Sequence, residues 1–482
     1  MNIVKKFSPK LSVILLSTVL AGCSLSPKYE RPGMPVPDQF PGQEGTSASA
    51  DAVQHTADLG WETFFKDERL KALIPIALEN NRDMRIAIQR VEEARALYGI
   101  QRSDRFPQIG VNAQQTAQRM PEDMRAGGAL SPSVSRSNIA GIGMTNFELD
   151  FFGRQKSLSE AAFEQFLATQ QARTTVQINL IGQLASTYFT LRNLEAQKEL
   201  INKTIKSRQG TLNLVQSRYS GGVASILDVN QAKTTLEAAK ASLSEITRSE
   251  MRARNALQLI LGQPIPTNLP PAAPFGSDVV MAKLPTGLPS DLLTRRPDIL
   301  AAENSLKAAN ANIGAARAAF FPSISLTGLL GFASPDLGSL FGGGNGMWSF
   351  NPVINIPIFT AGKLRNNLNL AEVRSDIAVA EYEKSIQSAF SEVADALAGE
   401  STYQSQLDAL RAQQAAAYET LKIANLRYSN GIDSFLQVQS AEVALFAVQQ
   451  GFLQTGFDSI QNRIELYKAL GGGWTQTSVI SK

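Results

Sequence analysis

Arg218-Tyr219-Ser220-Gly221-Gly222-Val223-Ala224-Ser225-Ile226-Leu227 returns later in the chain as Arg427-Tyr428-Ser429-Asn430-Gly431-Ile432-Asp433-Ser434-Phe435-Leu436. The offset between the two stretches is close to half of the 482-residue chain. Internal repetition on this scale predicts two copies of one architecture.

Each copy of this stretch has the residues of a sharp turn between two helices. Gly222 and Gly431 can adopt the left-handed backbone conformation that ends a helix. Ser225-x-x-Asp228 and Ser434-x-x-Gln437 then have the spacing of a capping box, in which two side chains bind free N–H groups of the next helix. The sequence therefore predicts one helical hairpin in each copy.

The N-terminus predicts export and lipid attachment. Three lysines border the apolar run 11–20, which is too short to span a bilayer and is typical of a signal peptide. The run ends in Leu20-Ala21-Gly22-Cys23, which resembles a bacterial lipobox, so we expect residues 1–22 to be removed and Cys23 to carry a lipid. Ser24 in the next position resembles lipoproteins sent to the outer membrane. An ordinary signal sequence with a chance cysteine is the alternative.

Composition argues against several classes of function. The formal net charge of +3 comes from the three lysines of the signal peptide, so the mature chain is neutral and nucleic-acid binding is not expected. Cys23 is the only cysteine and His55 the only histidine. We therefore expect no metal cluster, no catalytic residues and no cofactor other than the lipid on Cys23.

The chain between Cys23 and residue 60 is rich in proline, glycine and serine, which predicts an extended tether. Helical periodicity covers about 67–104, with Pro75 as a candidate kink, and a counterpart lies at 288–320.

Apolar residues alternate with polar ones after Phe106-Pro107 and after Phe321-Pro322, which predicts two β-hairpins with loops near 119–136 and 342–346. Strands of about 9–11 residues suit a tilted membrane strand, whereas a half-buried soluble sheet is the alternative. Four strands do not close a barrel, so we expect several chains to pool their strands. The alternating apolar residues are Ile109, Val111, Ala113, Phe147, Leu149, Phe151, Ile324, Leu326, Ile354, Ile356 and Ile358.

Two long stretches, 156–217 and 364–426, contain no proline and predict helices of about 60 residues, or roughly 90 Å. Return helices are predicted at about 225–260 and 434–470. The apolar stripes on these segments predict coiled-coil packing.

Several motifs together resemble the outer membrane factor family, in its OprM branch related to TolC, over residues 20–472. The resemblance implies a mixed α/β membrane protein. It implies a homotrimer whose 12-stranded β-barrel, with four strands from each chain, continues into a long periplasmic α-helical coiled-coil barrel. The motifs are the lipobox, Tyr29-x-Arg31-Pro32, Phe147-Glu148-Leu149-Asp150-Phe151-Phe152-Gly153-Arg154, Arg296-Pro297-Asp298, Phe321-Pro322 and the doubled Arg-Tyr-Ser-x-Gly turn.

The resemblance also gives the turn residues their roles. The hairpin tips would dock a periplasmic adaptor, although the glycines there can equally serve turn geometry alone. Just inside the return helices, the pore would narrow at Leu227, Asp228, Leu436 and Ser440. Asp228 can instead act only as a helix cap, and Ser440 stands where relatives commonly have aspartate, which argues against an acidic gate ring. The expected docking residues are Arg218, Tyr219, Gly221, Gly222, Arg427, Tyr428 and Gly431.

The implied function is the outer-membrane exit duct of a tripartite multidrug efflux system. Its expected partners are two further copies of the chain, a periplasmic adaptor, an inner-membrane transporter of the RND type and outer-membrane lipids. The alternatives are a duct for type I protein secretion or metal efflux, and an adaptor lipoprotein. An adaptor has one hairpin, whereas this chain is predicted to have two.

The expected organisation has six parts. They are the signal peptide (1–22), the tether (23–60), a first repeat (61–262, β-hairpin about 106–152, tip about 218–225), a linker (263–287), a second repeat (288–472, β-hairpin about 321–360, tip about 427–434) and a tail (473–482).

Overall fold

The computed structural model describes residues 25–41, 59–125, 128–276, 278–282, 284 and 289–472. The signal peptide, Cys23, His55 and the tail lie outside these residues. The described chain forms two compact units. Unit 1 comprises the residues up to Pro32 together with Val91–Thr169 and Ala302–Tyr382, and unit 2 comprises Gly33–Arg90, Gln170–Ala301 and the residues from Glu383 onward. Each unit therefore draws on both copies of the repeat.

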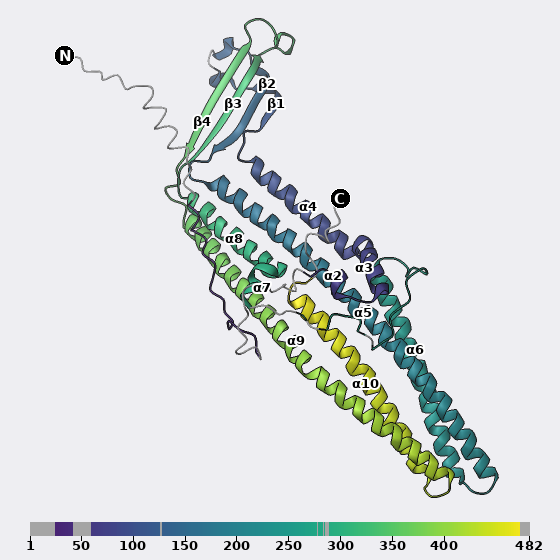
Figure 1. Cartoon of the computed structure of the whole chain (residues 1–482). Helices are drawn as coiled ribbons and strands as arrows, with labels where there is room; N and C mark the ends of the chain where they lie inside the picture. Colours follow the sequence, from purple (N-terminus) through teal and green to yellow (C-terminus); the bar gives the residue numbers. More distant parts are fainter. Residues whose placement is uncertain are drawn as a thin grey trace. The chain divides into compact units, whose positions relative to one another are not determined.

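The described secondary structure follows the predicted order (Figure 1). The helices are α2 (Trp61–Phe64), α3 (Glu68–Asn80), α4 (Arg82–Ser103), α5 (Arg154–Ser220), α6 (Ile226–Leu261), α7 (Pro289–Arg295), α8 (Pro297–Ala318), α9 (Lys363–Ser429) and α10 (Phe435–Ala469). The strands are β1 (Ile109–Arg119), β2 (Val134–Leu149), β3 (Ser323–Ser334) and β4 (Gly346–Asn355), with short 3-10 helices η2 (Glu122–Met124), η3 (Gly128–Leu130) and η4 (Leu337–Ser339).

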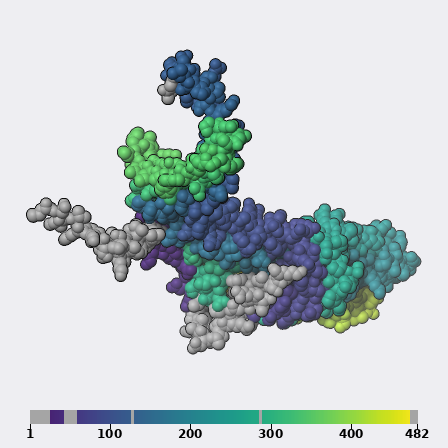
Figure 2. Space-filling model, turned by 90° about the horizontal axis from the view of Figure 1, so that it is seen from above, coloured from purple at the N-terminus to yellow at the C-terminus, as the bar shows by residue number. Residues whose placement is uncertain are grey.

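Unit 1 contains a four-stranded sheet in the order β1-β2-β3-β4, and every neighbouring pair is antiparallel. The space-filling view shows its strands, blue and green, as a curved wall (Figure 2). The register places Val111, Ile142, Leu330 and Trp348 opposite one another, so that one apolar row crosses all four strands. These four side chains are 82%, 57%, 69% and 76% exposed. The sheet thus presents an apolar face to its surroundings.

The strands differ from the sequence prediction in the length of β2. It begins at Val134, inside the predicted loop, and its 16 residues exceed the expected strand length. A register shift between Met144 and Phe147 interrupts its pairing with β3, and Asn146 in this interval has a φ of 54°. Phe151, predicted on the strand, follows its end. The extra length reflects pairing with β1 on one side and β3 on the other, which a one-strand pattern does not reveal.

Unit 2 has a helical core in which aromatic side chains pack closely. The rings of Phe64 and Tyr467 are stacked at 4.1 Å, and both residues are at most 2% exposed. Asp67, which is also buried, caps α3 by accepting from the backbone N–H of Arg69 and Leu70, and it accepts a hydrogen bond from the Tyr188 hydroxyl at 3.0 Å. This core joins residues far apart in the sequence.

The helical segment expected at 67–104 is divided near residue 80. Pro75 lies inside α3, which ends at its C-cap Asn81 before α4 begins at Arg82, and the kink at Pro75 stays a prediction. The Asn81 amide donates to the carbonyl of Ile260 at 2.9 Å and accepts from the backbone N–H of Met84 at 3.0 Å, so it caps the next helix. The boundary between α3 and α4 thus depends on a contact with a residue that is distant in the sequence.

The long helices α5 and α9 contain 67 residues each. At 1.5 Å per residue each is about 100 Å long. The return helices α6 and α10 begin within a residue of the predicted position. None of the helices in the described ranges combines the length and hydropathy needed to cross a membrane.

Candidate functional site

The two hairpin tips lie in unit 2 and have the same backbone geometry. In the first, Gly222 N–H donates to the Tyr219 carbonyl at 2.9 Å and Val223 N–H to the Arg218 carbonyl at 2.9 Å. In the second, Gly431 N–H donates to the carbonyl of Tyr428 at 3.0 Å and Ile432 N–H to that of Arg427 at 2.9 Å. These are paired Schellman motifs. The repeated sequence therefore encodes a repeated turn.

The glycines of the turns have two different roles. Gly222 and Gly431 have φ values of 77° and 74°, which L side chains rarely adopt. Gly221 lies outside that region, and a Cβ there would meet only ordinary contacts at 3.5 and 3.6 Å. Turn geometry thus accounts for Gly222 and Gly431, whereas the backbone conformation of Gly221 does not require glycine.

Of the two predicted capping boxes, only the first forms. The Ser225 hydroxyl accepts from the N–H of Asp228 at 3.2 Å, and the Asp228 carboxylate accepts from the N–H of Ser225 at 3.0 Å. Ser434 makes no side-chain cap hydrogen bond, so the prediction for Ser434-x-x-Gln437 is wrong. At this tip the neighbouring Asp433 forms an ion pair with Arg427, with contacts of 2.5 and 3.1 Å.

The two hairpins contact each other at their tips (Figure 1). Arg218 on α5 donates to the carbonyl of Ser429 at 3.1 Å, and its guanidinium lies 4.8 Å from the centre of the Tyr428 ring. Tyr428 is only 6% exposed because its ring also packs against Phe435 at 5.5 Å. Tyr219, the equivalent of Tyr428 in the first copy, is 46% exposed. The repeat is therefore asymmetric: one tyrosine is packed and the other is available to solvent.

An apolar cluster from four helices supports the tips. It joins α5, α6, α9 and α10 just inside the turns and fixes the two hairpins side by side. Its buried members are Leu212, Val215, Ala232, Leu236, Ala424, Tyr428, Phe435, Val438 and Ala441.

A buried polar group lies near this cluster and was not predicted from the sequence. Glu442 on α10 is 7% exposed and accepts a hydrogen bond from the Thr211 hydroxyl on α5 at 2.9 Å. Arg208, also buried, donates to the carbonyl of Thr235 on α6 at 2.7 Å. Burial raises the pKa of the Glu442 carboxyl, while the Thr211 hydrogen bond and the charge of Arg208 act in the opposite direction. The only sign of this burial in the sequence is that the apolar residues around Glu442 recur with helical periodicity.

The residues predicted to narrow the pore lie on the first turns of the return helices. Leu227 and Leu436 are 62% and 53% exposed, and Ser440 is exposed one turn further along α10. Neither leucine belongs to the cluster that packs the hairpins. Asp228 is engaged in its capping box, which is the alternative role expected for it. Both leucines are therefore available to a surface outside this chain.

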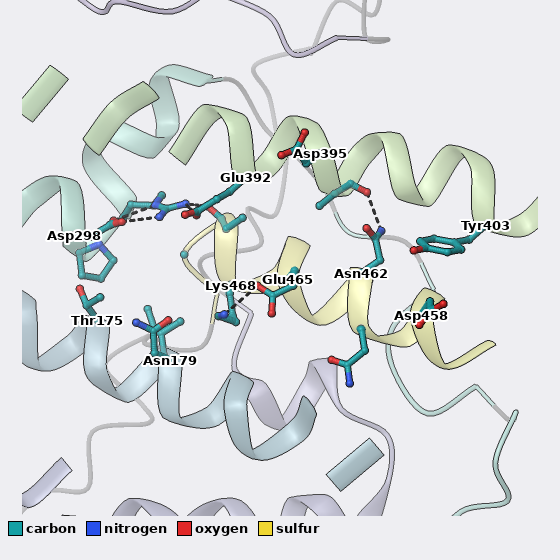
Figure 3. A pocket seen from close by; sticks show the side chains of 17 residues that line it. Thr175, Asn179, Asp298, Glu392, Asp395, Tyr403, Asp458, Asn462, Glu465 and Lys468 are labelled. Atoms are coloured by element: carbon teal, nitrogen blue, oxygen red, sulfur yellow. Dashed lines mark hydrogen bonds and ion pairs between the residues drawn. The ribbon is translucent and has the colours of Figure 1, made fainter. Parts of the chain in front are cut away.

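The motif Arg296-Pro297-Asp298 borders a cavity of about 580 Å³ in unit 2 (Figure 3). The Arg296 guanidinium, 9% exposed, pairs with Asp298 at 2.6 Å and with Glu392 of α9 at 2.8 Å, and it donates to the carbonyl of Ala469 at 2.9 Å. The motif thus fixes the start of α8 to two other helices. Across the described residues, no group of His, Cys, Asp and Glu side chains has an arrangement that could hold a metal ion.

Unit 1 has an exposed apolar face on its sheet, and unit 2 has two helical hairpins of matched geometry; both features are typical of a membrane-associated protein. The chain belongs to the outer membrane efflux protein family, whose model matches residues 73–263 and 288–472. The resemblance drawn from the sequence, the efflux role and the outer-membrane location are thereby confirmed.

Relatives and solved structures agree with this assignment. The chain is 46% identical to the solvent efflux pump outer membrane protein SrpC of Pseudomonas putida, over 95% of this chain and 97% of SrpC. It is 42% identical to the cation efflux system protein CusC of Escherichia coli O6:H1, over 97% and 99% of the two chains. The open state of the Neisseria gonorrhoeae MtrE outer membrane channel superposes with a TM-score of 0.85 at 39% identity, over 94% of this chain and 98% of that one.

Proposed function

We propose that three copies of this chain form the outer-membrane exit duct of a tripartite efflux system. The observation that carries the proposal is the apolar row Val111, Ile142, Leu330 and Trp348, which crosses the sheet between two open edges, β1 and β4. A bilayer does not tolerate open edges, because unpaired backbone groups there have no water to bind. Pairing β4 of one copy with β1 of the next closes a 12-stranded barrel and removes every edge.

The hairpin tips supply the other end of the duct. Gly221, Tyr219 and the exposed turn backbone form a surface that a periplasmic adaptor can dock on, and the adaptor links the duct to an inner-membrane pump of the RND type. Leu227 and Leu436 narrow the closed pore. The lipid on Cys23 anchors each copy to the outer membrane.

The proposed cargo is small organic molecules such as drugs and solvents, because SrpC is named for solvent efflux at 46% identity. Export of cations is the second candidate, since CusC, a cation efflux system protein, is 42% identical. Neither cargo requires a binding site in a passive duct.

The test is substrate accumulation in cells that lack the protein, complemented with variants. Gly221→Trp adds a large side chain to the docking surface without disturbing a left-handed residue. Gly210→Trp is the matched control, because a Cβ at this exposed helical position meets no atom within 4 Å and lies away from the turn. We expect wild type and Gly210→Trp to restore low accumulation of organic dyes and Gly221→Trp to fail, with equal trimer levels by native electrophoresis. Restoration by Gly221→Trp would exclude docking at this turn, and absence of a wild-type trimer would contradict the barrel.

A further inference from the structure

Exposed phenylalanine side chains lie at each of the four junctions in unit 1 between a strand and an α-helix: α4–β1, β2–α5, α8–β3 and β4–α9. The four strands begin or end at this level: the register pairs Ile109 with Met144, Leu149 with Ile324, and Ser323 with Asn355. The phenylalanines therefore lie at one end of the sheet, as a collar between its apolar face and the helices. The collar residues are Phe106, Phe151, Phe320, Phe321 and Phe359, which are 59%, 40%, 43%, 42% and 88% exposed.

Exposed basic residues stand on the helical side of this collar. Arg105 precedes Phe106, Lys156 follows Phe151, and Lys363 and Arg365 follow Phe359. All four basic residues are exposed, and among the described residues none of them forms an ion pair. Two other bases at this level are neutralised: Arg154 pairs with Glu148, and Arg317 lies 3.8 Å from Glu372.

The six bases named above stand against four acids at this level, Asp104, Glu148, Asp150 and Glu372, which leaves a surplus of positive charge. The Asp104 carboxylate accepts a hydrogen bond from Gln101, and the Asp150 carboxylate caps α5 by accepting from the backbone N–H of Lys156 at 2.7 Å. Aromatic rings concentrate where a bilayer meets water, and lysine and arginine just beyond them are attracted to anionic headgroups.

We propose that the collar is a binding surface for anionic phospholipid in the periplasmic leaflet of the outer membrane. The phenyl rings lie at the level where acyl chains begin, and the four free cations contact headgroup phosphates. The proposal rests on the sheet spanning the membrane as described under the proposed function, and it adds a preference for lipid charge.

The N-terminal segment from Ser26 to Arg31 packs along α8 toward the same level. The Ser26 hydroxyl lies 3.3 Å from that of Ser157, and the Ser26 backbone occupies the space that a side chain at Gly314 would need. The carbonyl of Pro27 accepts from the Asn310 amide at 2.8 Å.

The segment ends in a charged clamp. Arg31 donates three hydrogen bonds to the buried Glu303, at 2.9, 3.0 and 3.2 Å, and the Tyr29 hydroxyl donates to the same carboxylate at 3.1 Å. From Gly314 to Glu303 the segment therefore runs antiparallel to α8, and its N-terminal end points toward the collar at Phe320. The described N-terminal segment therefore approaches the level of the collar from the helical side.

The experiment measures phospholipid that remains bound to the full-length protein after extraction from native membranes, by native mass spectrometry. We expect phosphatidylglycerol to be enriched at least threefold over its share in the membrane relative to phosphatidylethanolamine. The variant with Arg105, Lys156, Lys363 and Arg365 all changed to Gln should lose this enrichment. The control changes four exposed, unpaired bases of unit 2 to Gln, namely Lys206, Lys233, Arg248 and Arg252, and should retain it.

Two results would overturn the proposal that the collar binds anionic phospholipid. One is wild-type protein without phosphatidylglycerol enrichment, and the other is unchanged enrichment in the collar variant. A wild-type trimer without enrichment contradicts the collar and leaves the duct intact, whereas absence of the trimer contradicts the duct itself.

A second measurement does not depend on the quadruple variant folding. In a Trp348→Phe background, whose remaining signal from Trp61 and Trp474 is subtracted, Phe359→Trp should be quenched by lipids brominated near the headgroup, and Tyr219→Trp at the hairpin tip should not. Equal quenching of both, or none at Phe359→Trp, contradicts the proposed depth.

Discussion

The guanidinium of Arg218 lies over the ring of Tyr428, 4.8 Å from its centre, and also donates to the carbonyl of Ser429 at the end of α9. A cation from the first hairpin thus contacts both the aromatic face and the negative helix end of the second. This contact holds the two tips together.

Replacing Arg218 with alanine should loosen the tips. A contact of this kind contributes about 1 kcal/mol. The equilibrium ratio of molecules whose two tips are in contact to molecules whose tips are apart should therefore fall about fivefold. The measurement is the conductance of purified protein in planar bilayers, which should increase. Arg427→Ala is the control, because Arg427 pairs with Asp433 inside its own hairpin. Equal increases for both variants would exclude a specific role for the contact between hairpins.

Gly222→Ala and Gly221→Ala should differ although the residues are adjacent. Only Gly222 has a left-handed φ, and placing alanine there costs about 1–2 kcal/mol. We expect faster trypsin cleavage at the tip of Gly222→Ala and wild-type cleavage for Gly221→Ala. Similar rates for the two variants would contradict the strain argument.

The serines that begin the return helices should also behave differently. Ser225→Ala removes a formed capping box and should destabilise the start of α6 by about 1 kcal/mol. Ser434→Ala removes a hydroxyl that makes no cap hydrogen bond, so its effect should be small. Hydrogen exchange of the first-turn amides measures both, and protection lost equally at the two helices would refute this asymmetry.

Glu442 should make the packed tips more stable in acid. Burial raises the pKa of its carboxyl above the ordinary value of 4.5. The packed state therefore binds the proton more tightly, and this stabilisation is complete below pH 4.5 and lost as the pH rises through the raised pKa. Glu442→Gln should remove this part of the pH dependence and stabilise the protein at neutral pH.

Thermal unfolding between pH 4 and pH 8 checks this expectation. Glu245→Gln is the matched control, because Glu245 is an exposed glutamate on α6. A wild-type pH profile that persists in Glu442→Gln would assign the dependence to another group.

What the sequence predicted well is local. Gly222 and Gly431 mark the turns because a left-handed residue is required by the few bonds around it. The helical spacing of apolar residues together with the absence of proline predicts α5 and α9. The apolar alternation of Ile109 and Val111 likewise predicts a strand without reference to its partner.

What it missed depends on residues distant in the chain. The break at Asn81 is set by the carbonyl of Ile260, and the packing of Tyr428 but not Tyr219 is set by Arg218. Ser434 has the same spacing as Ser225, yet spacing does not specify whether the cap forms. The hydrogen bond to the buried Glu442 likewise comes from a distant residue, Thr211 on α5.

The equal length of α5 and α9, 67 residues each, constrains any attempt to resize the protein. Removing one residue from a helix withdraws its end by 1.5 Å and rotates everything beyond the cut by about 100°. A deletion in α5 alone would misalign Arg218 with Tyr428 in both height and direction. A shorter version would need matched deletions in α5, α6, α9 and α10, and seven residues from each comes within about 20° of two whole turns. The lengths of these four helices can therefore be changed only together.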